Sequence, residues 1–143
     1  MSDTYVLVHG AWHTGAEMEA VADGLRAAGH TVHCPTVAGN NPGDDRAGTG
    51  LADAIASVVR FIEGKDLTQV RLVGHSYGGM VISGVADRIA ARLRRLVYIN
   101  AFVPLDGEAL NDMVPPHYVT MFDAVAVANG NAVTLPFEIW REA

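Results

Sequence analysis

The sequence predicts one three-layer α/β domain, in which about four parallel strands have helices on both faces. Three observations lead to this prediction. The chain has 143 residues, a length typical of a single domain. Half of its residues are apolar and only 18% are charged, which argues against disorder. Short apolar runs alternate with longer segments whose apolar residues recur at helical spacing, a pattern typical of βα repeats around a parallel sheet.

Four short apolar runs are predicted to be the strands. Residues 5–8 form a nearly continuous apolar run, as expected of a strand that is buried on both faces, and the run ends before Gly10. A second strand is predicted at residues 31–34, where Pro35 ends it. The remaining two strands are predicted at residues 70–73 and 96–99.

Three helices are predicted between and after these strands. The first covers about residues 17–28, with Gly29 as its terminal cap. Its inward-facing residues are predicted to be Met18, Val21, Leu25 and Ala28. The second covers about residues 51–62, and the third follows the turn at residues 74–79. Between the first two helices, residues 36–50 are rich in Gly, Asn, Asp and Pro and are predicted to be an exposed loop.

The alternation of strands and helices stops at Pro104. Pro115 and Pro116, with scattered aromatic residues, indicate an excursion from the sheet. We therefore divide the chain into a core at residues 1–103 and a second part at residues 104–143.

Composition and charge narrow the range of partners. Ten Lys and Arg residues against sixteen Asp and Glu residues give a net charge of −6, which argues against nucleic-acid binding. No apolar run approaches the roughly 20 residues of a membrane span, and the first residues lack the basic stretch of a secretory signal. The single cysteine, Cys34, cannot form a disulfide within the chain. We expect a cytoplasmic protein that binds neither nucleic acid nor membranes.

The chemistry is predicted at the turn between the third strand and the third helix. There the sequence reads Gly74-His75-Ser76-Tyr77-Gly78, a Gly-x-Ser-x-Gly pattern. A nucleophile on so tight a strand-to-helix turn needs glycine two residues before and two residues after it, because side chains there would clash. The helix that follows directs its unpaired N–H groups toward the same point. Ser76 is therefore the predicted nucleophile.

A second loop is predicted to face Ser76. It follows the first strand and contains Gly10, Ala11 and Trp12, and the carboxyl ends of parallel strands meet at one edge of a sheet. Acyl transfer needs two N–H donors for the oxyanion, and the backbone amides of Ala11 and Tyr77 are the candidates. Gly10 allows the chain to bend closely. Trp12 forms either a wall of the substrate pocket or part of the core.

Two rival interpretations of the same residues are weaker. Gly10 and Gly15 have the spacing of a phosphate-binding loop, but Ala16 and Glu17 stand where Lys and Ser or Thr are needed. A metal site among His9, His13, His30, His33 and Cys34 lacks a complete ligand set at suitable spacing. We expect neither a metal nor a cofactor.

Taken together, these residues resemble the α/β-hydrolase superfamily, and most of all the branch of plant methylesterases, salicylate-ester hydrolases and hydroxynitrile lyases. The similarity runs from Tyr5 to the end of the chain, with its anchors at residues 6–13, 27–32, 74–80 and 97–104. The resemblance implies Ser76 as nucleophile, the amides of Ala11 and Tyr77 as oxyanion hole, and the start of a cap over the pocket after Pro104. Lyase members have Thr where this chain has Gly10, so the resemblance favours ester hydrolysis.

The chain departs from the family in its catalytic acid and base. The family order is Ser, then acid, then His, on loops that follow later strands. His117 and Asp106 are poor candidates, because His117 belongs to the cap-like stretch and Asp106 to a turn. We expect the acid and the His to lie outside the given residues, and a second chain or fragment, or a homodimer, to complete the exposed edge of a truncated sheet.

The predicted function is hydrolysis of a small, fairly apolar carboxylic ester through an acyl-enzyme on Ser76. Two alternatives remain open. One is a lyase that cleaves cyanohydrins on the same scaffold. The other is a non-catalytic module that binds small molecules with an incomplete triad.

Overall fold

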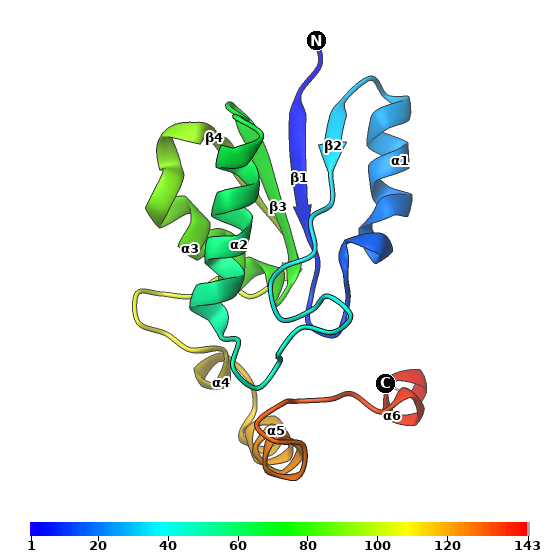
Figure 1. Cartoon of the computed structure of the whole chain (residues 1–143), viewed down its shortest axis with the longest axis vertical. Helices are drawn as coiled ribbons and strands as arrows, with labels where there is room; N and C mark the ends of the chain where they lie inside the picture. Colours follow the sequence, from blue (N-terminus) through cyan, green and yellow to red (C-terminus); the bar gives the residue numbers. More distant parts are fainter. Residues whose placement is uncertain (143) are drawn as a thin grey trace.

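The computed structural model describes residues 1–142. Its four strands form one sheet in the order β2-β1-β3-β4, and all neighbours are parallel (Figure 1). The strands are β1 (Thr4–Val8), β2 (Thr31–His33), β3 (Val70–Ser76) and β4 (Leu93–Ala101). The main helices are α1 (Glu19–Ala27), α2 (Leu51–Gly64) and α3 (Gly78–Ile89).

Helices cover the sheet on both faces, which confirms the predicted three-layer architecture. Val6 and Val8 of β1 pack into a core cluster with residues of α2 and α3. Leu7 points to the other face and packs with Met18 and Ala22, on the side of α1. Because successive side chains of a strand alternate between faces, a nearly continuous apolar run fills both cores.

The last two strands are longer than the apolar runs predicted. β3 continues through Gly74 and His75 to Ser76, and β4 begins at Leu93, before its apolar run. The parallel hydrogen-bonding ladder between them extends from Val70 to Ser76. Backbone pairing does not depend on side-chain polarity, so the apolar pattern alone underestimated both strands.

The first helix is preceded by a 3₁₀ turn, begins two residues later than predicted, and turns a different face to the core. Thr14 and Glu17 form a capping box, with the Thr14 N–H donating to Glu17 Oε2 at 2.7 Å. A 3₁₀ turn (Gly15–Met18) therefore precedes α1. Ala22 is fully buried, whereas Val21 is 50% exposed, so the prediction that Val21 faces inward was wrong. Ala28 is also exposed, at the end of the helix.

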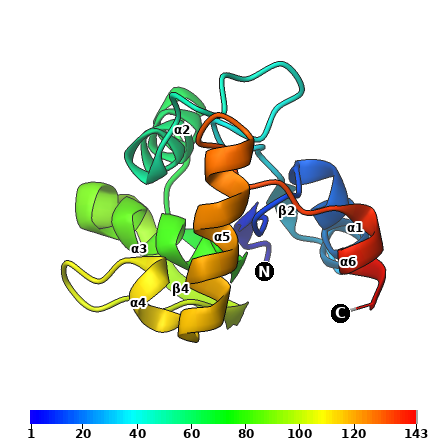
Figure 2. The same cartoon turned by 90° about the horizontal axis from the view of Figure 1, so that it is seen from below.

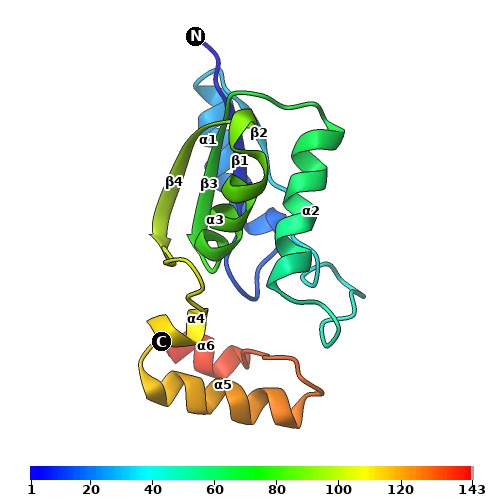
Figure 3. The same ribbon diagram turned by 90° about the vertical axis from the view of Figure 1, so that its left-hand side faces the viewer.

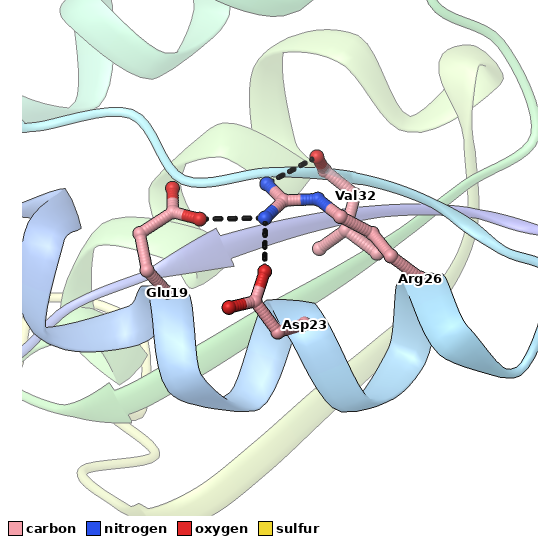
Figure 4. Close-up of polar contacts among 4 residues, drawn as sticks. All are labelled: Glu19, Asp23, Arg26 and Val32. Atoms are coloured by element: carbon pink, nitrogen blue, oxygen red, sulfur yellow. Dashed lines mark hydrogen bonds and ion pairs between the residues drawn. The ribbon is translucent and has the colours of Figure 1, made fainter.

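Arg26 fastens α1 to the strand beside it. Its guanidinium group donates to Glu19 at 2.6 Å and to Asp23 at 3.0 Å within the helix, and to the Val32 carbonyl oxygen of β2 at 3.1 Å (Figure 4). The Arg26 side chain also holds the pKa of the Glu19 carboxyl below its usual range. One cation thus fixes the helix against β2.

The loop at residues 36–50 was predicted to be exposed, and this was wrong in part. Val37 is fully buried in the core cluster of α2 and α3. Asp44 organises the next residues by accepting hydrogen bonds from the N–H groups of Gly39, at 2.8 Å, and Asn41, at 3.1 Å. The loop is therefore anchored at one end and internally bonded.

A short 3₁₀ turn (Ala90–Arg92) leads into β4. Three helices follow that strand. They are α4 (Leu110–Met113), α5 (Pro116–Ala128) and α6 (Phe137–Glu142). All three lie beyond the carboxyl ends of the strands (Figure 3), and α5 crosses that end when it is seen from below (Figure 2). A domain boundary at residues 103 and 104 stays a prediction. Within residues 1–142, every helix is too short or too polar to span a membrane.

Candidate active site

Ser76 lies at the end of β3, on a turn that glycine makes possible. Its φ of +54° is in the left-handed region, where a residue with a side chain is strained. A Cβ on Gly74 would lie 2.6 Å from the Gly78 carbonyl oxygen, and a Cβ on Gly78 would lie 2.6 Å from the Val8 carbonyl oxygen. Neither position has space for a side chain, so the chain passes close to itself on both sides of Ser76.

The neighbouring strand fixes the backbone of Ser76. A register shift between β3 and β4 pairs Ser76 with Ala101 and leaves Asn100 as the extra residue, with a φ of +44°. The N–H of Phe102 then donates to the Ser76 carbonyl oxygen at 3.1 Å. The glycines leave room for the strained turn, and the hydrogen bond from β4's following residue holds its backbone in place.

The loop after β1 contacts Ser76 directly. A Cβ built on Gly10 would lie 3.0 Å from the Ser76 Cβ and 3.2 Å from the His75 Nδ1. This space admits the backbone of Gly10 and little more. Gly10 therefore lies beside Ser76, and the prediction that Ala11 and Trp12 face Ser76 stays a prediction.

His9 anchors this loop from within the core. It is fully buried, its Nδ1–H donates to the Gly10 carbonyl oxygen at 2.8 Å, and its Nε2 accepts from the Val37 N–H at 3.1 Å. These two bonds require the neutral ring, since one nitrogen donates and the other accepts. Burial lowers the pKa of His9 below its ordinary value. A neutral imidazole with two hydrogen bonds therefore positions the backbone of Gly10.

A cavity of about 650 Å³ opens beside this loop. Four parts of the chain line it: residues 11–14, positions between 38 and 51, Tyr77, and residues 131–135. Ala11 and Tyr77, whose amides are the predicted oxyanion donors, are both in its wall. Ser76 is half-buried and is not among the wall residues, but Gly10 and Tyr77 connect it with the wall.

Trp12 lies in the cavity wall and not in the core. Its side chain is 45% exposed, and its indole N–H donates to the Val133 carbonyl oxygen at 2.9 Å. The ring centroid lies 6.2 Å from that of Phe122 on α5. Of the two interpretations that the sequence left open, core packing is wrong for this residue.

The weak triad candidates do not reach the nucleophile. His117 lies on the exposed surface of α5, with its ring centroid 4.5 Å from that of Tyr118. Asp106 is exposed in the turn after β4. In the part of the chain that the structure describes, no imidazole or carboxylate is hydrogen-bonded to the Ser76 hydroxyl.

The residues of the rejected metal hypothesis have other contacts. His30 Nδ1 accepts from the Asp3 N–H at 3.2 Å, and the His33 ring packs edge-on against Phe61. Burial raises the pKa of the Cys34 thiol to about 11, so the sulfur stays protonated at neutral pH. Residues 1–142 contain no group of three or more His, Cys, Asp or Glu side chains that could hold a metal ion.

Comparison with known proteins identifies the family of this chain. Residues 5–142 match the model of the alpha/beta hydrolase family. The chain belongs to this family. The solved structure of an extracellular alpha/beta-hydrolase from a Paenibacillus species superposes with a TM-score of 0.91 and 38% sequence identity, over 98% of this chain and 58% of that one.

The curated relatives align with about three quarters of this chain. A carbendazim hydrolyzing esterase of Nocardioides sp. is 50% identical over 113 residues, which are 78% of this chain and 47% of the relative. A pyrethroid hydrolase of Sphingobium wenxiniae is 32% identical over 117 residues, 78% of this chain and 40% of the relative. An alpha-hydroxynitrile lyase of Arabidopsis thaliana is 31% identical over 103 residues, 70% and 40% respectively. The chain spans about half the length of the curated relatives it matches.

Esterases predominate among the curated relatives, and a methylesterase and the alpha-hydroxynitrile lyase of Arabidopsis thaliana represent the predicted branch of the family. The wall residues beyond the two predicted loops were missed from the sequence. They are in the loop at residues 38–51 and in the segment at residues 131–135. The length of the first loop was a usable signal, since long loops without secondary structure are often functional. Nothing in the sequence around Val133 indicated a contact with Trp12.

Proposed function

We propose that this chain provides the nucleophile, the oxyanion hole and the substrate cavity of a serine-type carboxylic-ester hydrolase. The Ser76 hydroxyl attacks the ester carbonyl carbon and gives its proton to a base, which passes it to the departing alcohol. An acyl-enzyme on Ser76 remains, and water hydrolyses it to the free acid. The amides of Ala11 and Tyr77 donate to the oxyanion. The observation that supports this most is the contact of Gly10 with Ser76, beside a cavity whose wall contains both amide donors.

The proposed substrate is a small, fairly apolar ester. Trp12, Leu51 and Leu135 give the cavity wall large apolar side chains. The volume of about 650 Å³ is in the usual range for small-molecule sites. The names of two relatives, a carbendazim hydrolyzing esterase and a pyrethroid hydrolase, support hydrolysis as the reaction.

We propose further that the base and the acid that activate Ser76 come from outside the described residues. Without an imidazole, a serine hydroxyl stays protonated and is weakly nucleophilic at neutral pH. Triad enzymes that lack triad members retain about 10³–10⁴-fold acceleration over water from the oxyanion hole and binding. A second chain or fragment that pairs with β4 is the proposed partner, with a homodimer as one form of it.

Chemical rescue tests this proposal. Hydrolysis of p-nitrophenyl acetate is measured with increasing imidazole for the wild-type chain and for Ser76→Ala, and the second rate is subtracted from the first. A Ser76-dependent rate that rises with imidazole, with an acyl adduct on Ser76 in the mass spectrum, is the expected result. His117→Ala should leave both unchanged. A fast rate that imidazole does not raise and that His117→Ala abolishes would contradict the external base.

The two alternatives have their own tests. The similarity to an alpha-hydroxynitrile lyase favours cyanohydrin cleavage as a second candidate, and cyanide release from mandelonitrile measures it. A fluorophosphonate probe, applied with imidazole as an external base, separates an enzyme from a non-catalytic binding module, because a serine that the base activates reacts with the probe and a bare hydroxyl does not.

A cytoplasmic location also stays a proposal, and fractionation of the source cells tests it.

A further inference from the structure

Trp12 connects two parts of the chain that are far apart in sequence. Its indole Nε1–H donates to the Val133 carbonyl oxygen at 2.9 Å, across 121 positions of sequence. The same ring is tilted by 53° against Phe122 of α5. The loop that contains Ala11 is therefore joined to the helical segment beyond the sheet.

The main chain of Trp12 lies in a turn and in the left-handed region. Its φ is +61°, which a bulky residue rarely adopts. Such a conformation persists where the surroundings hold it. The ring lies outside both core clusters, and it contacts Val133 and Phe122 of the segment beyond the sheet.

The segment at residues 131–135 forms one wall of the cavity. Its first residues are tied to the end of α5, with the Asn131 N–H donating to the Ala126 carbonyl oxygen at 2.8 Å and the Ala132 N–H donating to the Asn129 carbonyl oxygen at 3.3 Å. At Val133 the bond is to Trp12 instead. The wall segment is thus held at its start by α5 and farther along by the indole.

We propose that Trp12 is a positioning residue that holds residues 131–135 as the outer wall of the cavity and so limits the size of the group that binds there. The identity of that group, an ester substituent, rests on the proposed function. The role of Trp12 in fixing residues 131–135 does not depend on it. Because Trp12 directly follows Ala11, the bond to Val133 also joins the wall segment to the loop that contains the proposed oxyanion amide.

Trp12→Phe tests the hold, because phenylalanine keeps an aromatic ring but has no N–H donor. Limited elastase cleavage after Ala132 or Val133, the small residues of the wall segment, is followed by mass spectrometry, and circular dichroism verifies that the variant folds. Loss of one hydrogen bond should raise the cleavage rate about 2- to 10-fold, since local opening precedes cleavage. The matched control is Phe122→Leu, which removes the ring contact and keeps the indole bond, and its effect should be smaller. An unchanged cleavage rate in Trp12→Phe would overturn the proposal.

A spectroscopic measurement identifies the bond itself. In the wild-type chain the indole N–H resonance of Trp12, assigned by its absence in Trp12→Phe, should exchange with water more slowly than that of an indole in open solvent. Phe122→Leu should leave this protection in place. A Trp12 resonance that exchanges as fast as free indole would show that the bond to Val133 does not form, which contradicts the proposal.

The consequence for the ligand is measured separately. Phenyl acetate is titrated into Ser76→Ala, which cannot turn it over, and into the same variant with Trp12→Phe. The dissociation constant should rise about 2- to 10-fold in the double variant. Equal dissociation constants would contradict the role of Trp12 in the wall. Absence of binding to Ser76→Ala would contradict the proposed function, while the cleavage experiment still decides on the hold.

Discussion

At Gly10 the backbone lies against the nucleophile with almost no spare room. A Cβ there would lie 3.0 Å from the Ser76 Cβ, and the side chain of His75 closes the other side at 3.2 Å. A substitution must therefore move either the loop that contains Ala11 or Ser76. Both belong to the proposed site, and neither is the flexible end of a long side chain.

We predict that Gly10→Ala lowers the Ser76-dependent hydrolysis of p-nitrophenyl acetate by up to about 10²-fold. The added Cβ displaces its neighbours by a few tenths of an ångström, and a misplacement of about 1 Å at a reacting group costs about 10²-fold. Gly24→Ala is the control. Gly24 lies within α1 with no atom within 4 Å of an added Cβ, so alanine should stabilise the fold by about 0.5–1 kcal/mol and leave the rate unchanged. Full activity of Gly10→Ala would show that the loop does not contribute to the reaction.

His9 links the site to the pH dependence of folding. Burial lowers its pKa in the folded chain below the ordinary 6.5, so the unfolded chain binds more protons as the pH falls through that value. The contribution of neutral His9 is complete above pH 6.5 and is lost as the pH falls through the lowered pKa. Burial also lowers the pKa of His33, which acts in the same direction.

We therefore predict that the free energy of unfolding, measured by urea denaturation, decreases between pH 7 and pH 5. His9→Gln should weaken this decrease, and it should also lower stability at pH 7 by about 1–3 kcal/mol if a buried partner loses its hydrogen bond. His117→Gln, at an exposed position, should leave the decrease as it is in the wild type. An equally steep decrease in His9→Gln would exclude His9 as its source.

Among the elements, α1 shows how a cap changes the face that a helix buries. The capping box of Thr14 and Glu17 starts the first turn at Gly15 as a 3₁₀ turn, so the apolar side is set by Met18 and Ala22. Val21, which helical spacing had placed inward, is 50% exposed. A period of 3.6 residues applies only from the point where the α-helix itself begins.

Substitutions at these two neighbouring positions should therefore change the free energy of unfolding by unequal amounts. Ala22→Leu overpacks a fully buried site and should cost about 1–3 kcal/mol of unfolding free energy. Val21→Ala should change it by less than about 0.5 kcal/mol. Urea denaturation of both variants measures these values, and a larger loss at Val21 than at Ala22 would contradict the observed orientation of α1.

At the scale of the whole molecule, β4 is an edge of the sheet. It pairs with β3 on one side and has no other strand neighbour within residues 1–142, and its Ile99 side chain is 47% exposed. An apolar edge strand is a template for pairing with another chain. This is the reason for the proposed partner chain or homodimer at β4.

We predict that the chain self-associates with rising concentration and that Ile99→Lys reduces this, because a charged side chain on an edge strand opposes pairing. Sedimentation velocity gives the distribution of species. Val127→Lys, at an 87% exposed position on α5, is the control and should associate as the wild type does. A wild-type chain that stays monomeric at every concentration would contradict a homodimer at this edge.

The amino-acid sequence alone determined the elements and the turn at Ser76. The apolar runs predicted four parallel strands, and the glycines at positions 74 and 78 predicted a tight strand-to-helix turn, because both features depend on residues that are adjacent in the chain. The resemblance that these residues carry led to the family that the comparisons found.

Only the tertiary structure decided which residues meet across the chain. It buried Val37 in a loop that composition had marked as exposed, and it brought the carbonyl oxygen of Val133 to the indole of Trp12. Backbone carbonyl groups are the same at every position, so no pattern of side chains encodes such a bond. Its existence depends on where α5 ends and on where the segment after it passes the loop that follows β1.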